Sequence, residues 1–380
     1  MQTLLYIEMY FLNLSIIHHI RSCMTMGSKV SSIATFSFSF LLIFLFIGFF
    51  AFANGKDEGT HNVYGTSVLI SDSVVVSQDG SGNFNTINQA VAAAPNNNNA
   101  IKGYFLINIK EGVYKEYVFI PKNKPYIMMV GQGFNRTVIT GNRNHDQGLK
   151  THDTPTFGFV AINLTFQNTA RPSKEQAVAL RNEADMSTFY RCIFDGHQDT
   201  LYVDKNRQFY IECDIYGTVD FIFGGAQVVL QNCNIYPRLP QHRQFNTITA
   251  SERMSPPDKA AITIHNCTVK PTRDLASSNG SVKTYLGRPW KKYSRVVVMQ
   301  TFLDSLIDPA GWFIGKGDGT SYFAEYDNRG PGANTSGRAT WPGYHLINAA
   351  DAAKFTVANF LQGNDWLPQT GVPYFPGLMP

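Results

Sequence analysis

The chain has 380 residues, of which 44% are hydrophobic and only 16% are charged, with a formal net charge of +4. Its 31 glycines and 13% aromatic residues are typical of a secreted β-protein with many turns, and they argue against a helical bundle or a disordered chain. The mild positive charge is spread along the sequence and gives no indication of nucleic-acid binding.

The N-terminus carries an apolar run, residues 37–52 (SFSFLLIFLFIGFFAF), preceded by Lys29 and followed by Ala53. This is the pattern of a secretory signal peptide cleaved after Ala53, so residues 1–53 are interpreted as an N-terminal extension plus signal peptide. An uncleaved membrane anchor is the alternative, although a spanning helix needs about 20 residues. Secretion also agrees with the Asn-X-Ser/Thr triplets at Asn135, Asn163, Asn266, Asn279 and Asn334.

Residues 54–72 are polar, and we expect them to be a flexible lead-in to a domain spanning residues 73–380. The first strand is expected to begin at Ser73. The segment 86–94 (TINQAVAAA) predicts a short helix with Thr86 as its N-cap, ended by Pro95. Because the open end of a solenoid has to be covered, this helix is interpreted as a cap over the first coil.

From Gly103 onward, short apolar runs alternate with polar turns. Without long helices between them, such runs favour a β-helix or a sandwich over a doubly wound sheet. The expected strands cover residues 104–109, 118–120, 126–130, 157–166, 177–180 and 228–230.

Four cysteines decide between these two folds. Cys213 lies 21 positions after Cys192 (213 − 192), Cys233 lies 20 positions after Cys213 (233 − 213), and Cys267 has a similar sequence context. Sandwich strands have no reason to repeat at such a period, whereas each period of a solenoid is one coil. The prediction is therefore all-β, a right-handed parallel β-helix with short capping helices.

The same cysteines are expected to stack inside the coils, either as small buried residues or with a pair such as Cys192–Cys213 joined by a disulfide. No CxxC motif or His-rich cluster accompanies them, so no metal site is expected. Residues 351–360 look like a short helix, and the Pro- and Gly-rich end from residue 368 is expected to fold back along the outside of the solenoid.

Polar residues recur with nearly the same period in residues 176–225. Gln176 and Gln198 lie 22 positions apart (198 − 176), and Asp199 and Asp220 lie 21 apart (220 − 199). Because neighbouring strands are about 4.8 Å apart, two carboxylates and two carboxamides are expected to meet on one surface. Glutamines can also form structural ladders, and Asp199 could be an ordinary turn residue. Asp220 lies between apolar residues, where an unpaired carboxylate would be costly to bury.

Five segments then carry a family resemblance. They are GVYKE at 112–116, QAVAL at 176–180, GHQDTL at 196–201, DFIFG at 220–224 and YLGRPW at 285–290. In this order they resemble the signatures of plant pectin methylesterases, from about residue 74 to residue 378. The resemblance implies a right-handed parallel β-helix that removes methyl groups from homogalacturonan in pectin without a metal or organic cofactor.

The resemblance also implies residue roles. Asp220 corresponds to the nucleophile, Asp199 to the general acid/base, and Gln198 and Gln176 to carboxamides that bind substrate and stabilise the oxyanion. Further residues implied to bind substrate are Thr151, Arg288 and Trp290, while His197, where the family usually has Tyr, is interpreted as a rim residue. The implied protein is a monomer in the extracellular cell wall, with pectin and a proteinaceous pectinesterase inhibitor as partners and no nucleic acid.

The chemistry of these side chains agrees with those roles. A carboxylate can attack the methyl ester to give an acyl-enzyme, and a second carboxyl can protonate the departing methoxide. Two neighbouring carboxyls repel as anions, and an Arg beside Asp220 is expected to leave the proton on Asp199.

One departure from the family keeps two alternatives open. Near residues 151–160 (THDTPTFGFV) the chain is several residues shorter than the family pattern. A catalytically impaired pectin-binding homologue is therefore one alternative. A β-helix pectin glycosidase is the other, because paired carboxylates also suit a retaining glycosidase.

Overall fold

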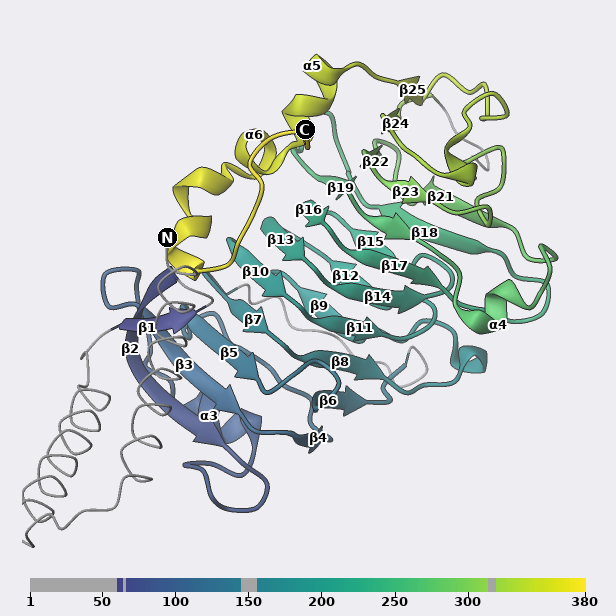
Figure 1. Cartoon of the computed structure of the whole chain (residues 1–380). Coiled ribbons are helices and arrows are strands. Elements are labelled where there is room, and N and C mark those ends of the chain that lie inside the picture. Colours follow the sequence, from purple (N-terminus) through teal and green to yellow (C-terminus); the bar gives the residue numbers. More distant parts are fainter. Residues whose placement is uncertain (1–59, 64–65, 145–155, 314–318) are drawn as a thin grey trace, which may run out of the picture. The chain divides into compact units, whose positions relative to one another are not determined.

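The computed structural model describes residues 60–63, 66–144, 156–313 and 319–380, in which short strands are wound into successive coils (Figure 1). The first two strands pair antiparallel, and the strand pairs that follow are parallel. Three sheets result, because each complete coil contributes one strand to each of them.

The bounds of these strands show how short they are. The 12-stranded sheet consists of β1 (Thr60–Val63), β2 (Thr66–Val76), β3 (Tyr104–Ile109), β5 (Ile127–Gly131), β7 (Val160–Ile162), β10 (Ser187–Tyr190), β13 (Arg207–Ile211), β16 (Gln227–Gln231), β19 (Ala261–His265), β22 (Arg295–Met299), β24 (Tyr322–Tyr326) and β25 (Tyr344–Leu346). The eight-stranded sheet consists of β4 (Gly112–Tyr114), β6 (Thr137–Gly141), β8 (Thr165–Asn168), β11 (Ile193–Asp195), β14 (Asp214–Gly217), β17 (Asn234–Pro237), β20 (Thr268–Val269) and β23 (Phe302–Leu303). The five-stranded sheet consists of β9 (Leu180–Asn182), β12 (Leu201–Val203), β15 (Ile222–Gly224), β18 (Asn246–Ser251) and β21 (Thr284–Pro289).

The sequence offset between paired residues of neighbouring strands equals the period found in the sequence. Tyr190 of β10 lies opposite Ile211 of β13, which lies opposite Gln231 of β16. The partner is thus displaced by 21 positions (211 − 190) and then by 20 (231 − 211), which are the spacings of the first three cysteines. One sequence period is one coil, and the predicted parallel β-helix is confirmed.

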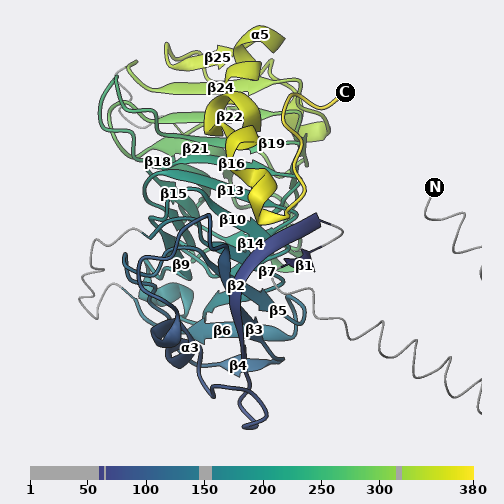
Figure 2. The same cartoon turned by 90° about the vertical axis from the view of Figure 1, so that its left-hand side faces the viewer.

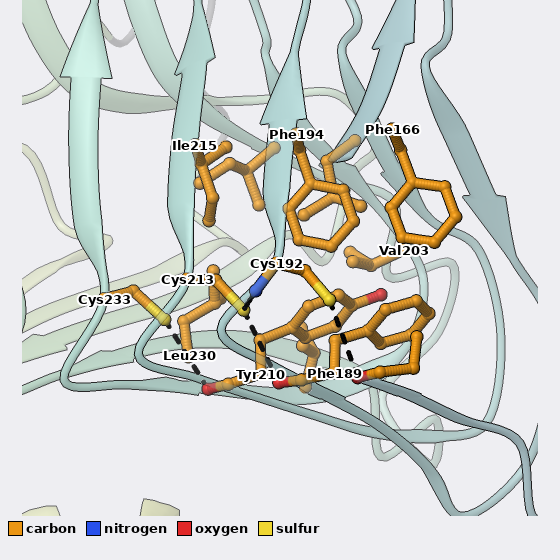
Figure 3. Packing of buried hydrophobic residues seen from close by; sticks show 14 of the residues in the cluster. Phe166, Phe189, Cys192, Phe194, Val203, Tyr210, Cys213, Ile215, Leu230 and Cys233 are labelled. Atoms are coloured by element: carbon orange, nitrogen blue, oxygen red, sulfur yellow. Dashed lines mark hydrogen bonds between the residues drawn. The ribbon is translucent and has the colours of Figure 1, made fainter. Parts of the chain in front are cut away.

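The interior of the coils is apolar and ordered in stacks (Figure 3). The rings of Phe189 and Tyr210 stack at 4.7 Å, and Phe166 and Phe194 stack at 5.6 Å. The four cysteines among the described residues are buried and free, so the disulfide alternative is not realised. The Cys213 thiol instead donates to the carbonyl of Phe189 at 3.4 Å.

A left-handed residue marks the bend that precedes each cysteine. Arg191, Glu212, Asn232 and Asn266 have φ of 52°, 50°, 54° and 52°. Asn163 has φ of 57° at the equivalent bend one coil earlier, and it splits the single strand expected at 157–166 into β7 and β8.

The N-terminal end of the solenoid differs from the expectation in part. Helix α3 (Ile87–Ala93) has Thr86 as its N-cap, in a capping box with Gln89, and its buried face joins the core, as predicted. The flexible lead-in and the strand start at Ser73 are wrong for the described residues, because β1 and β2 begin at Thr60 and Thr66. The expected strand at 118–120 is not a strand either.

The C-terminal segment packs against the 12-stranded sheet, as expected (Figure 2). The single helix predicted at 351–360 is broken into α5 (Ala349–Ala352), η4 (Ala353–Phe355) and α6 (Val357–Leu361), because Thr356 has extended backbone. The extended tail after α6 is fixed by Gln231, which exchanges two hydrogen bonds with the backbone of Phe375 at 2.9 and 2.8 Å.

The remaining short helices are α4 (Arg273–Ala276), η2 (Pro172–Lys174), η3 (Pro331–Ala333), η5 (Gly363–Asp365) and η6 (Leu367–Thr370). Within the described ranges, no helix is both long and apolar enough to cross a membrane. The proposed signal peptide and Thr151 lie outside the described residues.

Candidate active site

The two predicted carboxylates lie at corresponding positions of successive coils. Asp199 is in the turn between β11 and β12, and Asp220 is in the turn between β14 and β15. Because Leu201 of β12 lies opposite Ile222 of β15, the two aspartates are in register, and the N–H of Asp199 donates to the carbonyl of Val219 at 3.1 Å. Both have left-handed backbone, with φ of 62° and 53°. Such backbone is costly for a non-glycine residue and is frequent at functional sites.

Asp220 is held by a bidentate ion pair with Arg288. The Arg288 Nε donates to Asp220 Oδ1 at 2.8 Å and its Nη2 donates to Oδ2 at 2.5 Å. The Asp220 side chain is 14% exposed, so this pair is partly shielded from water. The hydrogen bond to Asp220 raises the pKa of Arg288, which keeps the guanidinium charged. Gly287 allows this placement, because a Cβ there would lie 2.0 Å from the Thr249 hydroxyl oxygen.

Asp199 has the opposite protonation preference. Burial, and secondly the charge of Asp220, raise its pKa to about 8, while Arg288 acts in the other direction. Asp199 therefore holds a proton at neutral pH, next to a carboxylate that is paired with an arginine. A protonated and an ionised carboxyl side by side form an acid and a nucleophile at one place.

The segments that carry the two carboxamides lie side by side in successive coils, next to the turn of Asp199. Ala179 and Leu180 both donate their N–H to the Thr200 carbonyl, at 2.9 and 3.3 Å, so the register shifts by one residue just before β9 and Gln176 lies opposite Gln198. The carbonyl of Gln198 accepts from the N–H of Ala177 at 3.1 Å, so the two segments are adjacent. The Gln176 Oε1 is buried and has no hydrogen-bond partner among the described residues. A buried polar atom without a partner is costly, and a bound water or substrate group would satisfy it.

An aromatic surface lies next to the carboxylates. Trp290 is 43% exposed, and its ring lies 5.8 Å from Phe223 and 6.4 Å from Tyr202. Tyr202 and Phe223 stack on each other at 4.4 Å. Neither ring is among the residues predicted from the sequence, although their separation of 21 positions (223 − 202) is the coil period and could have identified them.

Thr247 is a further residue that was not predicted from the sequence. It is completely buried in β18, and its hydroxyl donates to Asp220 Oδ1 at 2.5 Å. Thr247 lies 27 positions after Asp220 (247 − 220), because the intervening coil has a longer loop, and a search at a period of 21 therefore passes over it.

His197 is half-buried beside Gln198, and burial lowers the pKa of its imidazole. Its backbone carbonyl accepts from the Thr200 hydroxyl at 3.0 Å and from the Thr218 N–H at 2.9 Å. Thr151 is outside the described residues. Among the described residues, no strand pairs with the free edge of β9 in the five-stranded sheet.

The part of the chain that the structure describes contains no group of three or more His, Cys, Asp or Glu side chains arranged to hold a metal ion. The described groups at this site are a buried carboxyl, a carboxyl paired with an arginine, the segments of two carboxamides and an aromatic cluster.

Comparisons with known proteins agree with one another. The family model described as Pectinesterase matches residues 73–364. The "Probable pectinesterase/pectinesterase inhibitor 20" of Arabidopsis thaliana is 53% identical over 356 residues, which cover 87% of this chain and 64% of that protein. The chain thus spans roughly half to two thirds of the length of the curated relatives it matches.

Solved structures match over nearly their whole length. "Pectin methylesterase from Carrot" has 47% sequence identity and a TM-score of 0.78, covering 80% of this chain and 98% of that one. A pectin methylesterase in complex with hexasaccharide VII has 28% identity and a TM-score of 0.61, with the same coverage.

Proposed function

The chain belongs to the pectinesterase family, and from this we propose that it is a carboxylic ester hydrolase that removes methyl groups from homogalacturonan in pectin and releases methanol. The observation that carries the proposal is the pair of unlike carboxyls. Asp199 has its pKa raised to about 8, while Asp220 is in a bidentate ion pair with Arg288.

In the first step of the proposed reaction, Asp220 attacks the ester carbonyl carbon C6 of a methylated galacturonate. The bond between C6 and the methoxy oxygen breaks, and Asp199 gives its proton to the departing methoxide, so that methanol leaves. The carboxamides of Gln198 and Gln176 donate to the oxyanion and do not titrate while doing so. The product of this step is an acyl-enzyme on Asp220.

In the second step, water attacks C6 and gives a proton to the now ionised Asp199. The bond between C6 and Asp220 breaks, its electron pair returns to Asp220, and Asp199 is again protonated. The raised pKa of Asp199 supports this double use, because a carboxyl that titrates near neutral pH can both give and take a proton there.

The substrate assignment rests on the surface beside Asp220. Trp290 offers a half-exposed flat face for a sugar ring, and the stacked rings of Tyr202 and the buried Phe223 pack beside it. The similar pectin methylesterase that was solved in complex with a hexasaccharide supports an oligosaccharide ligand here as well. Arg288 borders the same surface, and Thr151 is proposed as a further substrate contact.

Secretion to the cell wall, glycosylation and cleavage of a signal peptide belong to the same proposal, since the substrate is extracellular. A proteinaceous inhibitor is proposed as a second partner, and the name of the Arabidopsis relative, which includes a pectinesterase inhibitor, supports it. The proposed active form is a monomer that needs no metal or organic cofactor.

The test is incubation of the chain from Asn54 with highly methylated pectin, measuring methanol and reducing ends in parallel. We expect methanol without new reducing ends. Replacing the nucleophile by Asp220→Asn should lower methanol release on the order of a thousand-fold or more, because the acyl-enzyme can no longer form. New reducing ends from the wild-type chain would support the glycosidase alternative instead.

Because the sequence near residues 151–160 is shorter than the family pattern, loss of turnover is tested separately. Retained pectin binding with no more methanol from the wild-type chain than from Asp220→Asn would identify a binding homologue and contradict the proposal.

A further inference from the structure

Thr247 is the residue that faces Asp220 from the next coil. The pairing of β15 with β18 sets Ile222 opposite Thr249, and two residues earlier it sets Asp220 opposite Thr247. The Thr247 side chain is completely buried, so its hydroxyl is shielded from bulk water. A shielded hydroxyl beside the proposed nucleophile bears directly on how that carboxylate is held.

The hydroxyl makes two hydrogen bonds, and both are to Asp220. It donates to Asp220 Oδ1 at 2.5 Å and accepts from the Asp220 backbone N–H at 2.9 Å. A threonine hydroxyl has one proton to donate, and here the carboxylate receives it. The backbone N–H and the carboxylate of Asp220 are thereby both hydrogen-bonded to the Thr247 hydroxyl, which stabilises the left-handed backbone of Asp220 at φ of 53°.

The two carboxylate oxygens of Asp220 consequently differ. Oδ1 accepts from Thr247 and from Arg288 Nε, whereas Oδ2 accepts from Arg288 Nη2 alone among the described residues. Since a carboxylate oxygen has two lone-pair sites, both sites of Oδ1 are occupied and one site of Oδ2 is left. The geometry makes Oδ2 the oxygen that can reach a carbonyl carbon.

We propose that Thr247 is a positioning residue of the esterase reaction, which selects Asp220 Oδ2 as the attacking atom and favours release of the acyl group. This inference rests on the proposed function. In the first step the Oδ2–C6 bond forms, the C6–methoxy bond breaks and the Asp199 proton leaves with methanol. Oδ1 is then the carbonyl oxygen on the Asp220 side of the mixed anhydride and carries no formal charge.

The bond from Thr247 changes in strength along this sequence. A hydroxyl donates more strongly to a carboxylate than to a neutral carbonyl, so the bond weakens when the acyl-enzyme forms. It is regained when water adds to C6, the C6–Oδ2 bond breaks and the electron pair returns to Asp220. On this ground Thr247 does not speed the first step, in which the bond weakens, and lowers the barrier of the second step, in which the bond is regained.

The test is Thr247→Val, which keeps the shape of the side chain and removes the hydroxyl. Loss of a hydrogen bond to a charged group predicts a fall in kcat of about 10- to 100-fold. Because the second step is slowed most, KM should fall with kcat, and rapid-quench measurement should show a methanol burst of about one equivalent per enzyme. The accumulated acyl-enzyme should add the mass of the uronyl group to Asp220 in the intact protein.

Two matched variants separate this effect from loss of a buried side chain. Thr247→Ser keeps the hydroxyl and should recover most of the turnover that Thr247→Val loses. Thr263→Val removes an equally buried hydroxyl, on β19, that bonds to none of the described residues, and it should behave as wild type. If valine is not tolerated at 247, the pair Thr247→Ser and Thr247→Ala carries the same comparison, with melting temperatures as the check on folding.

A wild-type kcat without a burst in Thr247→Val would overturn the inference alone. So would equal losses in Thr247→Val and Thr247→Ser that follow their melting temperatures. A wild-type chain that releases no methanol would overturn the proposed function, and the inference with it.

Discussion

Asp199 and Asp220 are the same residue type and occupy corresponding turns of successive coils. Their environments nevertheless differ, because Asp199 is held in its protonated form and Asp220 is paired with an arginine. The difference comes from neighbours outside the repeat. Arg288 comes from two coils further along the five-stranded sheet and pairs with Asp220. The same arginine lowers the pKa of Asp199 by less than burial raises it. Environment thus assigns two roles to one residue type, as in other acid and base pairs.

The pKa of Asp199 predicts a pH-dependent gain in stability for Asp199→Asn. The pKa is raised from 3.8 to about 8, so between these values the unfolded chain releases a proton that the folded chain keeps. Folding therefore loses stability from this group as pH rises through that window. Asparagine removes the loss, and the melting temperature of the variant minus that of wild type should grow from pH 4 to pH 8 and then level off.

Differential scanning fluorimetry at pH 4, 6, 8 and 9 measures this difference. Asp72→Asn, at an exposed position, controls for the general loss of one carboxylate. A difference that stays constant or shrinks as pH rises would show that Asp199 is not held in its protonated form.

At the scale of the element, the bend before each of the four cysteines requires a left-handed residue, and the residue types at this position differ in how well they tolerate such backbone. Asn232 and Asn266 occupy the left-handed position with a residue type enriched there, whereas Glu212 occupies it at φ of 50° without that advantage. Its ion pair with Arg191 is 38% exposed on the Glu212 side and contributes little.

Glu212→Asn should therefore stabilise the protein by about 0.5–1 kcal/mol, because left-handed backbone costs most other residues about 1–2 kcal/mol. Urea denaturation, read from the transition midpoint at constant slope, measures this gain. Glu212→Ala removes the same ion pair without relieving the backbone and should be no more stable than wild type. Equal stabilities of the two variants would mean that the bend imposes no such cost.

The same bends explain how far the sequence could predict the elements. The cysteine period predicts the coil, the stacking of Cys192 on Cys213 and the adjacency of Asp199 and Asp220, because nothing interrupts these coils. It fails at Thr247, which a longer loop moves to an interval of 27. Loop length is set by packing outside the repeat, so the period alone cannot supply it.

At the scale of the whole solenoid, the C-terminal segment joins parts that are far apart in the coil order. Trp366 and Leu361 share a hydrophobic cluster with Val68 and Ile70 of β2, at the N-terminal end of the sheet. The sequence predicted that this segment folds back, but not where it docks. Val68 and Ile70 alternate with exposed residues, as a strand with one buried face does, but the strand and the C-terminal segment that cover this face are distant in sequence, so the polar composition of residues 54–72 predicts a flexible lead-in instead.

Stacked coils contact only their neighbours, so a solenoid tends to unfold in parts unless something bridges it. Trp366 is 2% exposed, and its indole N–H donates to the Leu361 carbonyl at 3.1 Å, so it anchors the bridging segment. Trp366→Ala should cost about 3–5 kcal/mol. In calorimetry the melting temperature should fall by several degrees, and the single transition should broaden or split as the N-terminal coils uncouple from the rest.

Trp290→Ala, at a half-exposed ring in the proposed substrate surface, is the matched control. It should leave the melting temperature nearly unchanged and raise KM for pectin. A Trp366→Ala transition as sharp as that of wild type would show that the coils are coupled without this bridge.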